Sequence, residues 1–237
     1  EALLAHTAST VKRMLSEEQG SMLVFLPGQG EIRRVADMLA SLPDNVSLHP
    51  LYGDLSAAEQ DAAIAPAAPG KRKVVLATSI AETSLTIEGV RVVVDCGLSR
   101  TARFSPATGM SALITVRVTQ DAADQRAGRA GRVEPGICVR LWHEGDVLLP
   151  SRRPEILDAD LAPFLLDVLA WGSLPQELPL LTPAPEASLA QARQTLELLG
   201  AVRESNGRSA LSSHGEALAR MPMHPRLAQM ALLAGEH

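Results

Sequence analysis

The chain has 237 residues, of which 46% are hydrophobic and 21% are charged. This length and composition exclude a disordered polypeptide, and the length exceeds that of one ordinary domain and suits one and a half to two domains with buried cores. The formal net charge of −5 argues against binding nucleic acid through overall charge alone, and 3% aromatic residues argue against base stacking on aromatic platforms. The apolar runs are far shorter than the ~20 residues of a membrane helix, so we expect no membrane contact and a cytoplasmic location.

The first half of the chain alternates apolar runs with amphipathic segments. Ile32, Val35, Met38 and Leu39 fall on one face of an expected helix, and Ser56 with Glu59 forms a capping box for a second helix that ends near Ile64. This alternation predicts an α/β fold, a parallel sheet with helices on both faces and ligands at the carboxyl ends of the strands. The four apolar runs expected as strands are 21–28, 46–55, 71–78 and 90–97.

The pattern then changes to a projecting β-hairpin. Residues 100–118 read as two strands around a turn from Pro106 to Gly109, and Thr119 is a candidate N-cap of the next helix. A further strand is expected at 136–142, followed by a loop-like stretch to about residue 155.

Beyond residue 155 the chain is Leu-rich and mostly helical. A helix is expected at 187–199, a small hairpin around Asn206-Gly207 and a second helix from about His214, an order typical of a winged-helix domain. The expected division is therefore 1–155 for the α/β domain, 156–220 for a winged-helix domain and 221–237 for the start of a truncated helical domain. Cys96 and Cys138 lack metal-ligand spacing and are expected to be buried small side chains in a reducing compartment.

The string QRAGRAGR at 125–132 is the most unusual stretch. On a helix, Arg126, Arg129 and Arg132 would lie within a ~120° stripe, with glycines that leave room for a bulky anion. Residues 100–153 hold nine arginines against five acids, and arginine forks suit bidentate phosphate contacts. The alternative interpretation is a basic helix end that is exposed to solvent and has no ligand. This interpretation fits the string poorly, because the string follows a parallel sheet.

A second candidate is the hydroxyl-rich loop ATSIAETSLTIEG at 77–89, which is suited either to phosphate oxygens or to local helix capping. Taken alone, Gly28 and Gly53 are better explained as turn residues than as binding residues. The chain has no G-x-x-x-x-G-K-[ST] loop, no D-E-x-[HD] strand end for magnesium and no catalytic Ser/His/Asp elbow. It therefore carries half a nucleotide site at most, and no metal site of its own is expected.

Five strings together resemble one family: LVFLPG, LYGDL, ATSIAETSLTI, VVVDCGL and QRAGRAGR occur in order. The chain resembles the second RecA-like domain of DEAH-box (DEAH/RHA) ATP-dependent helicases, most of all the bacterial HrpB group. The tail resembles the winged-helix domain and the start of the helical, ratchet-type domain of that family. The resemblance covers nearly the whole chain, and we expect a piece of a longer protein.

The resemblance implies a role for each site residue. Arg129 and Arg132 match arginine fingers and Gln125 matches the residue that positions water, whereas Arg126 matches a structural or inter-domain position. The residues implied to face the nucleotide are Ser84, Thr86, Glu88 and Ile64. The residues implied to contact the nucleic-acid backbone are Thr78, Ser79, Gly28, Gly53, Arg100 and Arg103.

Three positions depart from the family pattern. Many relatives have Asn at Ser79, several have Asp at Glu88, and some have an aromatic residue at Ile64 that stacks on adenine. The implied base preference is therefore weak.

The implied function is the C-terminal part of an ATP-dependent RNA, or DNA, helicase or translocase. It uses ATP with Mg²⁺, the metal being held mainly by the first RecA-like domain of the same chain. The implied partner is single-stranded or partly duplex nucleic acid, RNA favoured, and the fragment alone is expected to be inactive. The alternative is a non-enzymatic nucleic-acid-binding or adaptor module on a RecA-like scaffold.

Overall fold

The computed structural model describes residues 1–237 except 84, 106, 133, 206–207 and 236–237. The chain divides into two compact units. Unit 1 comprises Glu1–Thr101 and Leu113–Arg152, and unit 2 comprises Ala102–Ala112 and Arg153–His237. The turn residues Pro106, Asn206 and Gly207, and the site candidate Ser84, lie outside the described residues.

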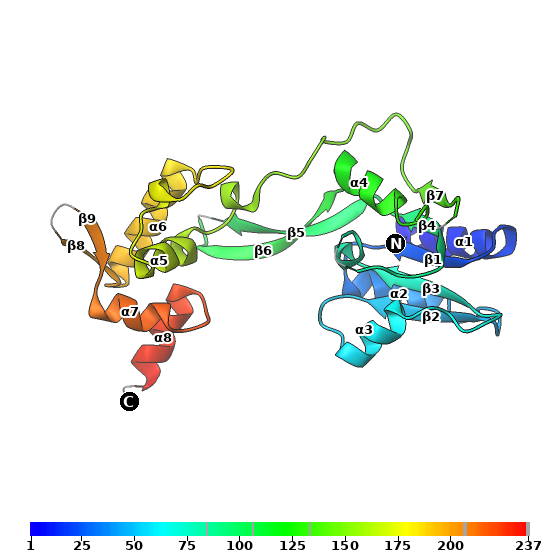
Figure 1. The fold of residues 1–237 in the computed structure, drawn as a ribbon, viewed down its shortest axis with the longest axis horizontal. Helices are drawn as coiled ribbons and strands as arrows, with labels where there is room; N and C mark the ends of the chain where they lie inside the picture. Colours follow the sequence, from blue (N-terminus) through cyan, green and yellow to red (C-terminus); the bar gives the residue numbers. More distant parts are fainter. Residues whose placement is uncertain (84, 106, 133, 206–207, 236–237) are drawn as a thin grey trace. The chain divides into compact units, whose positions relative to one another are not determined.

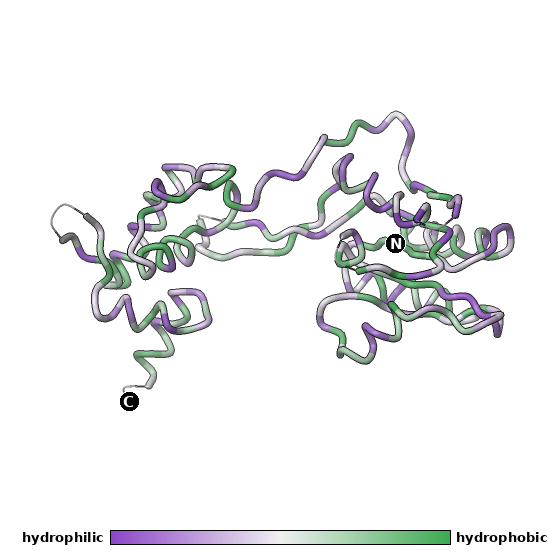
Figure 2. Tube along the Cα trace, viewed as in Figure 1, coloured by the Kyte–Doolittle hydropathy of each residue, from purple (hydrophilic) through white to green (hydrophobic). Residues whose placement is uncertain are grey.

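Unit 1 is built on a five-stranded parallel sheet with strand order β2-β3-β1-β4-β7 (Figure 1). Four of its strands begin and end within the apolar runs singled out above, and Figure 2 shows their hydrophobic character. The fifth, β7, falls within the expected strand at 136–142. The predicted parallel sheet is therefore confirmed. The strands are β1 Ser21–Phe25, β2 Val46–Leu51, β3 Arg72–Ala77, β4 Val90–Asp95 and β7 Ile137–Arg140.

Helices cover both faces of this sheet, as the sequence predicts. The helices α1 Ala2–Glu17 and α2 Gln29–Met38 pack on one face. The helix α3 Ala57–Ile64 and the segment after β3 pack on the other. Helix α1 was not predicted, because threonines interrupt its apolar face; Thr7 is nevertheless buried, since its hydroxyl donates to Leu3 O at 2.8 Å.

The predicted inward face of α2 is wrong at one position. Met38 is 38% exposed, whereas Ile32, Val35 and Leu39 are each at most 1% exposed. The chain leaves the helix at Leu39, whose N–H bonds both Val35 O and Ala36 O, and this tighter turn directs Leu39 into the core.

Helix α3 is fixed at both ends by polar contacts. The predicted capping box is present: Ser56 Oγ accepts from the Glu59 N–H, and the Glu59 carboxylate accepts from the Ser56 N–H. At the other end, the ammonium of buried Lys73 on β3 donates to the carbonyls of Ala62, Ala63 and Ala65 at 2.7, 2.8 and 2.5 Å. Strand β3 therefore supplies donors to the helix's last turn, where carbonyls lack partners of their own.

A two-stranded sheet of β5 Leu98–Ser105 and β6 Met110–Arg117 follows β4, as the hairpin prediction requires. Helix α4 Gln120–Ala127 comes next, with Thr119 at its N-cap position. Before β7, Gly136 passes so close to the backbone that an added Cβ would lie 1.8 Å from Ala130 O. Only glycine fits there, so the chain after QRAGRAGR is held tightly.

Unit 2 contains its own hydrophobic core, in which Leu165, Leu196 and Leu218 are almost fully buried. Its small antiparallel sheet pairs Val202 with Leu211. The elements are η2 Glu155–Leu157, α5 Ala162–Ala170, η3 Pro175–Glu177, α6 Glu186–Leu198, β8 Val202–Ser205, β9 Arg208–Leu211, α7 Ser213–Ala219 and α8 Pro225–Gly235. Among the described residues, no helix combines the length and apolar character needed to cross a bilayer.

Candidate functional site

The QRAGRAGR stretch does not form the single helical stripe expected from its spacing. Helix α4 ends at Ala127 with Gly128 as its C-cap, and Arg129 and Arg132 follow in turns. The Arg129 N–H bonds Arg126 O three residues back, a closure tighter than that of an α-helix. The prediction of three arginines on one face is therefore wrong, because the glycine-rich end of the helix redirects the chain.

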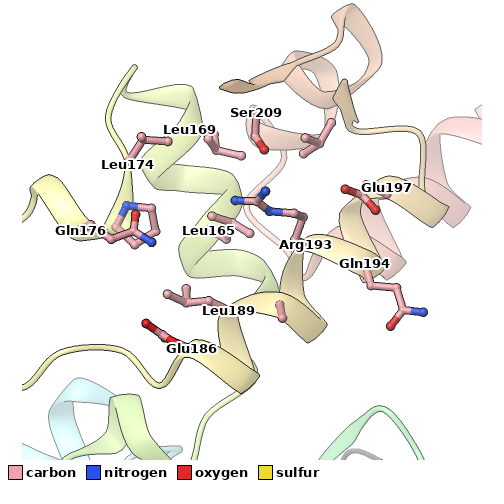
Figure 3. Close-up of a pocket in the computed structure, with 13 residues that line it drawn as sticks. Leu165, Leu169, Leu174, Gln176, Glu186, Leu189, Arg193, Gln194, Glu197 and Ser209 are labelled. Atoms are coloured by element: carbon pink, nitrogen blue, oxygen red, sulfur yellow. The ribbon is translucent and has the colours of Figure 1, made fainter. Parts of the chain in front are cut away.

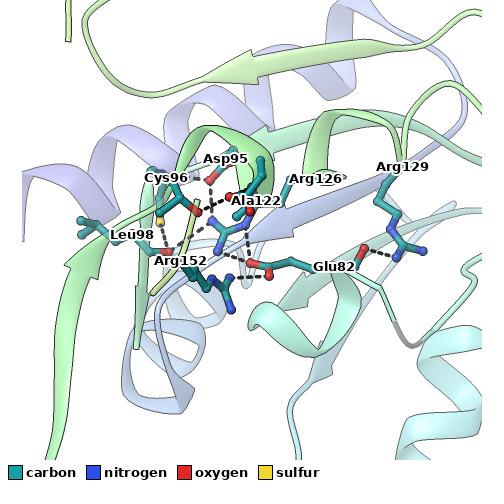
Figure 4. A network of polar contacts seen from close by, with 11 residues as sticks. Glu82, Asp95, Cys96, Leu98, Ala122, Arg126, Arg129 and Arg152 are labelled. Carbon is teal, nitrogen blue, oxygen red and sulfur yellow. Dashed lines mark hydrogen bonds and ion pairs between the residues drawn. The ribbon is translucent and has the colours of Figure 1, made fainter. Parts of the chain in front are cut away.

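Arg126 is the largest fully buried side chain among the described residues. Its Nε and Nη2 donate to Glu82 Oε1 at 2.9 and 2.6 Å, and its Nη1 donates to Asp95 Oδ1 at 2.7 Å (Figure 4). The guanidinium also lies 4.8 Å from the ring centre of Phe25 and donates to Leu98 O. Arg126 thus ties the hydroxyl-rich loop to the end of β4, which supports its structural assignment.

The electrostatics of this cluster are set by burial and by the ion pairs. Burial raises the pKa of Asp95 above its ordinary value, and the charge of Arg126 and the Gly97 N–H offset this only in part. Burial alone would lower the pKa of Arg126, but the charges of Asp95 and Glu82 raise it. Each partner favours the charged form of the other, so neither can be removed without leaving the other in an apolar interior without its main counter-charge.

Arg129 and Arg132 both reach the hydroxyl-rich loop, but in different environments. Arg129 is 7% exposed and donates through Nη2 to Glu82 O and through Nη1 to Leu85 O, the latter at 2.7 Å. Arg132 is exposed and donates to Thr86 Oγ1 at 2.8 Å. The structure therefore joins two of the five strings that carry the resemblance, ATSIAETSLTI and QRAGRAGR, and leaves Arg132 accessible to an anion.

The remaining nucleotide-facing candidates lie in unit 1 with unequal exposure. Gln125 is exposed on α4, one residue before Arg126. Glu88 is exposed near the end of the hydroxyl-rich loop, and Ile64 is half-buried at the end of α3. Of this group, Thr86 contacts an arginine of QRAGRAGR, because its hydroxyl accepts a hydrogen bond from Arg132.

The candidates for backbone contacts are distributed over both units. Gly28, the N-cap of α2, is buried beneath Arg100, because an added Cβ would lie 2.7 Å from the Arg100 guanidinium. Arg100 in turn pairs with Glu31 at 3.2 Å. These three residues form one small polar cluster at the carboxyl end of β1, which the sequence did not predict.

Thr78 and Ser79 are half-buried after β3, where the short helix η1 Ser79–Ala81 begins. An added Cβ at Gly53 would meet open space. Arg103 belongs to unit 2 and lines a pocket of about 220 Å³ beside Asp158 and Asp160.

Arg126 and Arg129 form one cluster of polar contacts with Glu82, Asp95 and Arg152, which we call the arginine cluster. The last three of these residues were not predicted from the sequence. Glu82 is the centre of the cluster, since Arg126 binds one carboxylate oxygen, Arg152 binds the other at 2.5 Å and Arg129 binds its carbonyl (Figure 4). The available signal was a carboxylate inside an apolar run, as in VVVDCG, because such a residue requires a buried cation.

Unit 2 holds a pocket of about 370 Å³ between α5 and α6, floored by Leu165 and Leu169 with Arg193 at its centre (Figure 3). None of the predicted site residues lines it. Within the described residues, no group of three or more His, Cys, Asp or Glu side chains is placed to hold a metal ion.

Comparison with known proteins supports the motif resemblance. The model of the helicase conserved C-terminal domain matches residues 6–134. The chain is 48% identical over 231 residues to the ATP-dependent RNA helicase HrpB of Escherichia coli (strain K12), covering 96% of this chain and 28% of that protein. It is 41% identical over 226 residues to the chloroplastic ATP-dependent RNA helicase DEAH12 of Arabidopsis thaliana, covering 94% of this chain and 12% of that protein.

Among solved structures, the Escherichia coli DEAH/RHA helicase HrpB matches with a TM-score of 0.88 and 48% identity, over 96% of this chain and 29% of that one. The resemblance to DEAH-box helicases and the RecA-like fold predicted from the sequence are thereby confirmed. The chain spans between about a tenth and three tenths of the length of these relatives.

Proposed function

Because the chain belongs to the family of helicase conserved C-terminal domains, we propose that it is the second RecA-like part of an ATP-dependent RNA helicase or translocase. One observation carries this proposal beyond the similarity. The exposed guanidinium of Arg132 is joined to the Thr86 hydroxyl at 2.8 Å, at the edge of a parallel sheet where ligands bind. This arrangement suits charge that develops on a γ-phosphate.

The two proposed arginine fingers differ in what they must give up to reach a phosphate. To bind a phosphate, Arg132 gives up one hydrogen bond to a neutral acceptor, the Thr86 hydroxyl, and this loss costs little free energy. Arg129 exchanges the carbonyls of Glu82 and Leu85, and its pKa is lowered by burial and by the charge of Arg132. Gln125 is proposed to position the attacking water from α4. Both arginines act on ATP that is brought by the first RecA-like domain.

The chain's residues fit the phosphate part of ATP, since the Arg132 guanidinium is exposed and permanently charged. Glu88 is proposed to face the ribose and Ile64 the base, with Ser84 and Thr86 sensing the nucleotide. Magnesium bound with ATP would neutralise phosphate charge, and the family resemblance assigns its ligands mainly to the first RecA-like domain.

The nucleic-acid backbone is proposed to run along the carboxyl ends of the strands, past Thr78, Ser79 and Gly53. Arg100, which packs on Gly28, offers a cation to a phosphate there, although its ion pair with Glu31 partly neutralises its charge. Arg103, on β5, is proposed as a further contact to the nucleic-acid backbone. Such contacts carry little sequence information, so we expect broad sequence tolerance, with RNA favoured because the named relatives are RNA helicases.

The proposed organisation is an α/β domain over 1–155, a winged-helix domain over 156–220 and the start of a helical domain over 221–237. The proposed location is the cytoplasm. The alternative, a non-enzymatic adaptor, predicts that the sequence encoded before Glu1 lacks a phosphate loop and a DEAH-type strand end.

The test uses the full-length protein that contains this chain. Arg129→Ala and Arg132→Ala should each lower ATP turnover by roughly 10³-fold or more while leaving RNA binding mostly intact. Arg129→Ala should also lower the thermal stability of the chain, because two carbonyls lose their donor, whereas Arg132→Ala should not. The matched control is Arg33→Ala on the exposed side of α2.

Unchanged turnover in both variants would overturn the assignment of the arginines. The 237-residue chain alone should show no ATP hydrolysis, and measurable turnover by it would contradict the proposal of a divided site.

A further inference from the structure

The tip of the β5–β6 hairpin is held by an arginine outside the site described above. Arg226, on α8, donates through Nη1 to the carbonyl of Gly109, where β6 is about to begin. Its Nη2 lies 3.5 Å from Thr195 Oγ1 on α6, and its Nη1 lies 3.5 Å from Asp160 Oδ2. One guanidinium therefore connects the hairpin tip to α6 and to the segment before α5, all within unit 2.

Gly109 is suited to this contact for two separate reasons. Its φ of +64° lies in the left-handed region that favours glycine. An added Cβ would also lie 2.7 Å from Arg226 Nη1, so a larger residue would displace the guanidinium. The backbone of the tip is thus shaped to receive Arg226.

The arginine is itself held in place by a partly buried carboxylate, that of Asp160. Asp160 is 12% exposed at its side chain and accepts from His224 Nε2 at 2.9 Å and from the Ala162 N–H at 3.0 Å. A second contact reinforces the hairpin, because the Phe104 N–H bonds Asp158 O at 3.4 Å. Polar contacts therefore join the hairpin tip to the helical part of unit 2.

We propose that Arg226 is a positioning residue that clamps the hairpin tip to the helical unit. The clamp keeps the tip of the hairpin with the helices of unit 2. The family resemblance implies that the 100–118 hairpin lies near the 5′ end of the bound strand and helps to separate duplexes. If the proposed helicase function holds, on which this consequence rests, Arg226 sets the place where a duplex meets the hairpin and so couples ATP turnover to strand separation.

The clamp is tested first in the 237-residue chain by hydrogen exchange. Arg226→Ala should speed exchange of the Phe104 and Gly109 amides about tenfold, as expected for the loss of one hydrogen bond from a charged donor. Arg226→Lys keeps the charge without the fork and should give a smaller increase. The matched control, Arg220→Ala at the exposed end of α7, should leave both amides unchanged.

Equal exchange in Arg226→Ala and Arg220→Ala would overturn the clamp. The Leu165 amide, bonded to Leu161 O inside α5, monitors the fold and should exchange equally in all variants. If Arg226→Ala does not fold, the exchange rates of the Phe104 and Gly109 amides are compared between Arg226→Lys and Arg220→Ala. Faster exchange in Arg226→Lys supports the clamp, and equal exchange overturns it.

The consequence is tested in the full-length protein with an RNA duplex that carries a single-stranded extension. Arg226→Ala should lower unwinding per ATP hydrolysed about tenfold while ATP turnover and single-strand affinity match those of Arg220→Ala. An unchanged ratio of unwinding to turnover would refute the positioning role. If the wild-type protein neither hydrolyses ATP nor unwinds, the proposed function fails, and the exchange comparison alone still decides whether Arg226 clamps the tip.

Discussion

Removing the guanidinium of Arg126 should destabilise unit 1 more than any exposed arginine substitution in the chain. Arg126→Ala deletes two hydrogen bonds to Glu82, one to Asp95 and one to the carbonyl of Leu98. The Asp95 side chain is fully buried, and its Oδ2 already lacks a hydrogen-bond partner within the described part of the chain. Glu82 keeps Arg152, whereas Asp95 keeps only the Gly97 N–H among the contacts described above.

The magnitude follows from this loss of compensation. Removing one partner of a buried ion pair costs about 3–5 kcal/mol, largely because the other charge stays buried. Whole domains are stable by about 5–15 kcal/mol, so the variant should retain a folded but much weakened unit 1. With a urea dependence of about 2 kcal/mol per molar, the unfolding midpoint of unit 1 should fall by about 1.5–2.5 M.

The chain's two tryptophans allow the two units to be followed separately. Trp142 packs on Gly97 in unit 1, and Trp171 lies exposed in unit 2. Urea unfolding in a Trp171→Phe background, followed by Trp142 fluorescence, therefore reports unit 1. Arg33→Ala is the control and should change the unfolding free energy by about 0.5 kcal/mol or less.

The pH dependence of this loss provides a signature of the buried carboxylate. An acid whose pKa is raised on folding binds its proton more tightly in the folded state, so the folded state gains stability as pH falls from the raised pKa towards the ordinary value of 3.8. Without Arg126 the pKa of Asp95 should rise further, and the variant should recover part of its loss at pH 5 relative to pH 8. A loss below about 1 kcal/mol, or an equal loss at both pH values, would refute the reasoning.

Two further predictions concern groups outside this cluster. Burial raises the pKa of the Cys96 thiol to about 12, so iodoacetamide at pH 8 should label Cys96 only on unfolding. In a Cys138→Ser background, which removes the half-buried second thiol, rapid labelling of the folded chain, seen by intact mass, would contradict this. The Ser56 hydroxyl, and then its N–H, lower the pKa of Glu59, a stabilisation present above about pH 4.5 and lost as pH falls through the folded pKa. Ser56→Ala should raise the pKa of Glu59 towards its ordinary value, and an NMR titration that shows no change would exclude the capping box in solution.

Local signals in the sequence were enough to predict the framework of unit 1. Each central strand is a continuous apolar run, since both faces of a parallel sheet are buried, and the box of Ser56 and Glu59 depends on a spacing of three residues. Helix α1 escaped prediction because the burial of Thr7 depends on a hydroxyl bond to its own backbone, which reduces the contrast of the apolar face.

The roles of the arginines could not be separated from the string alone. Arg126 lies 44 residues from Glu82 and 31 from Asp95, so its burial depends on the meeting of three distant segments. Gly128 ends the helix between Arg126 and Arg129, and this turn decides that one arginine points into the core and the next towards the loop. The family resemblance distinguished Arg126 from its neighbours, but the spacing of the residues did not.

The hydrogen bonds from Lys73 to the last turn of α3 have a consequence for local unfolding of unit 1. With eight residues and only Ala63 buried, α3 is too short to hold its shape independently. Its final carbonyls depend on an ammonium that is carried by β3, an inner strand between β2 and β1. The helix and the strand therefore form one cooperative unit: the last turn of α3 resists fraying for as long as β3 stays paired, and loses its donors when the sheet separates.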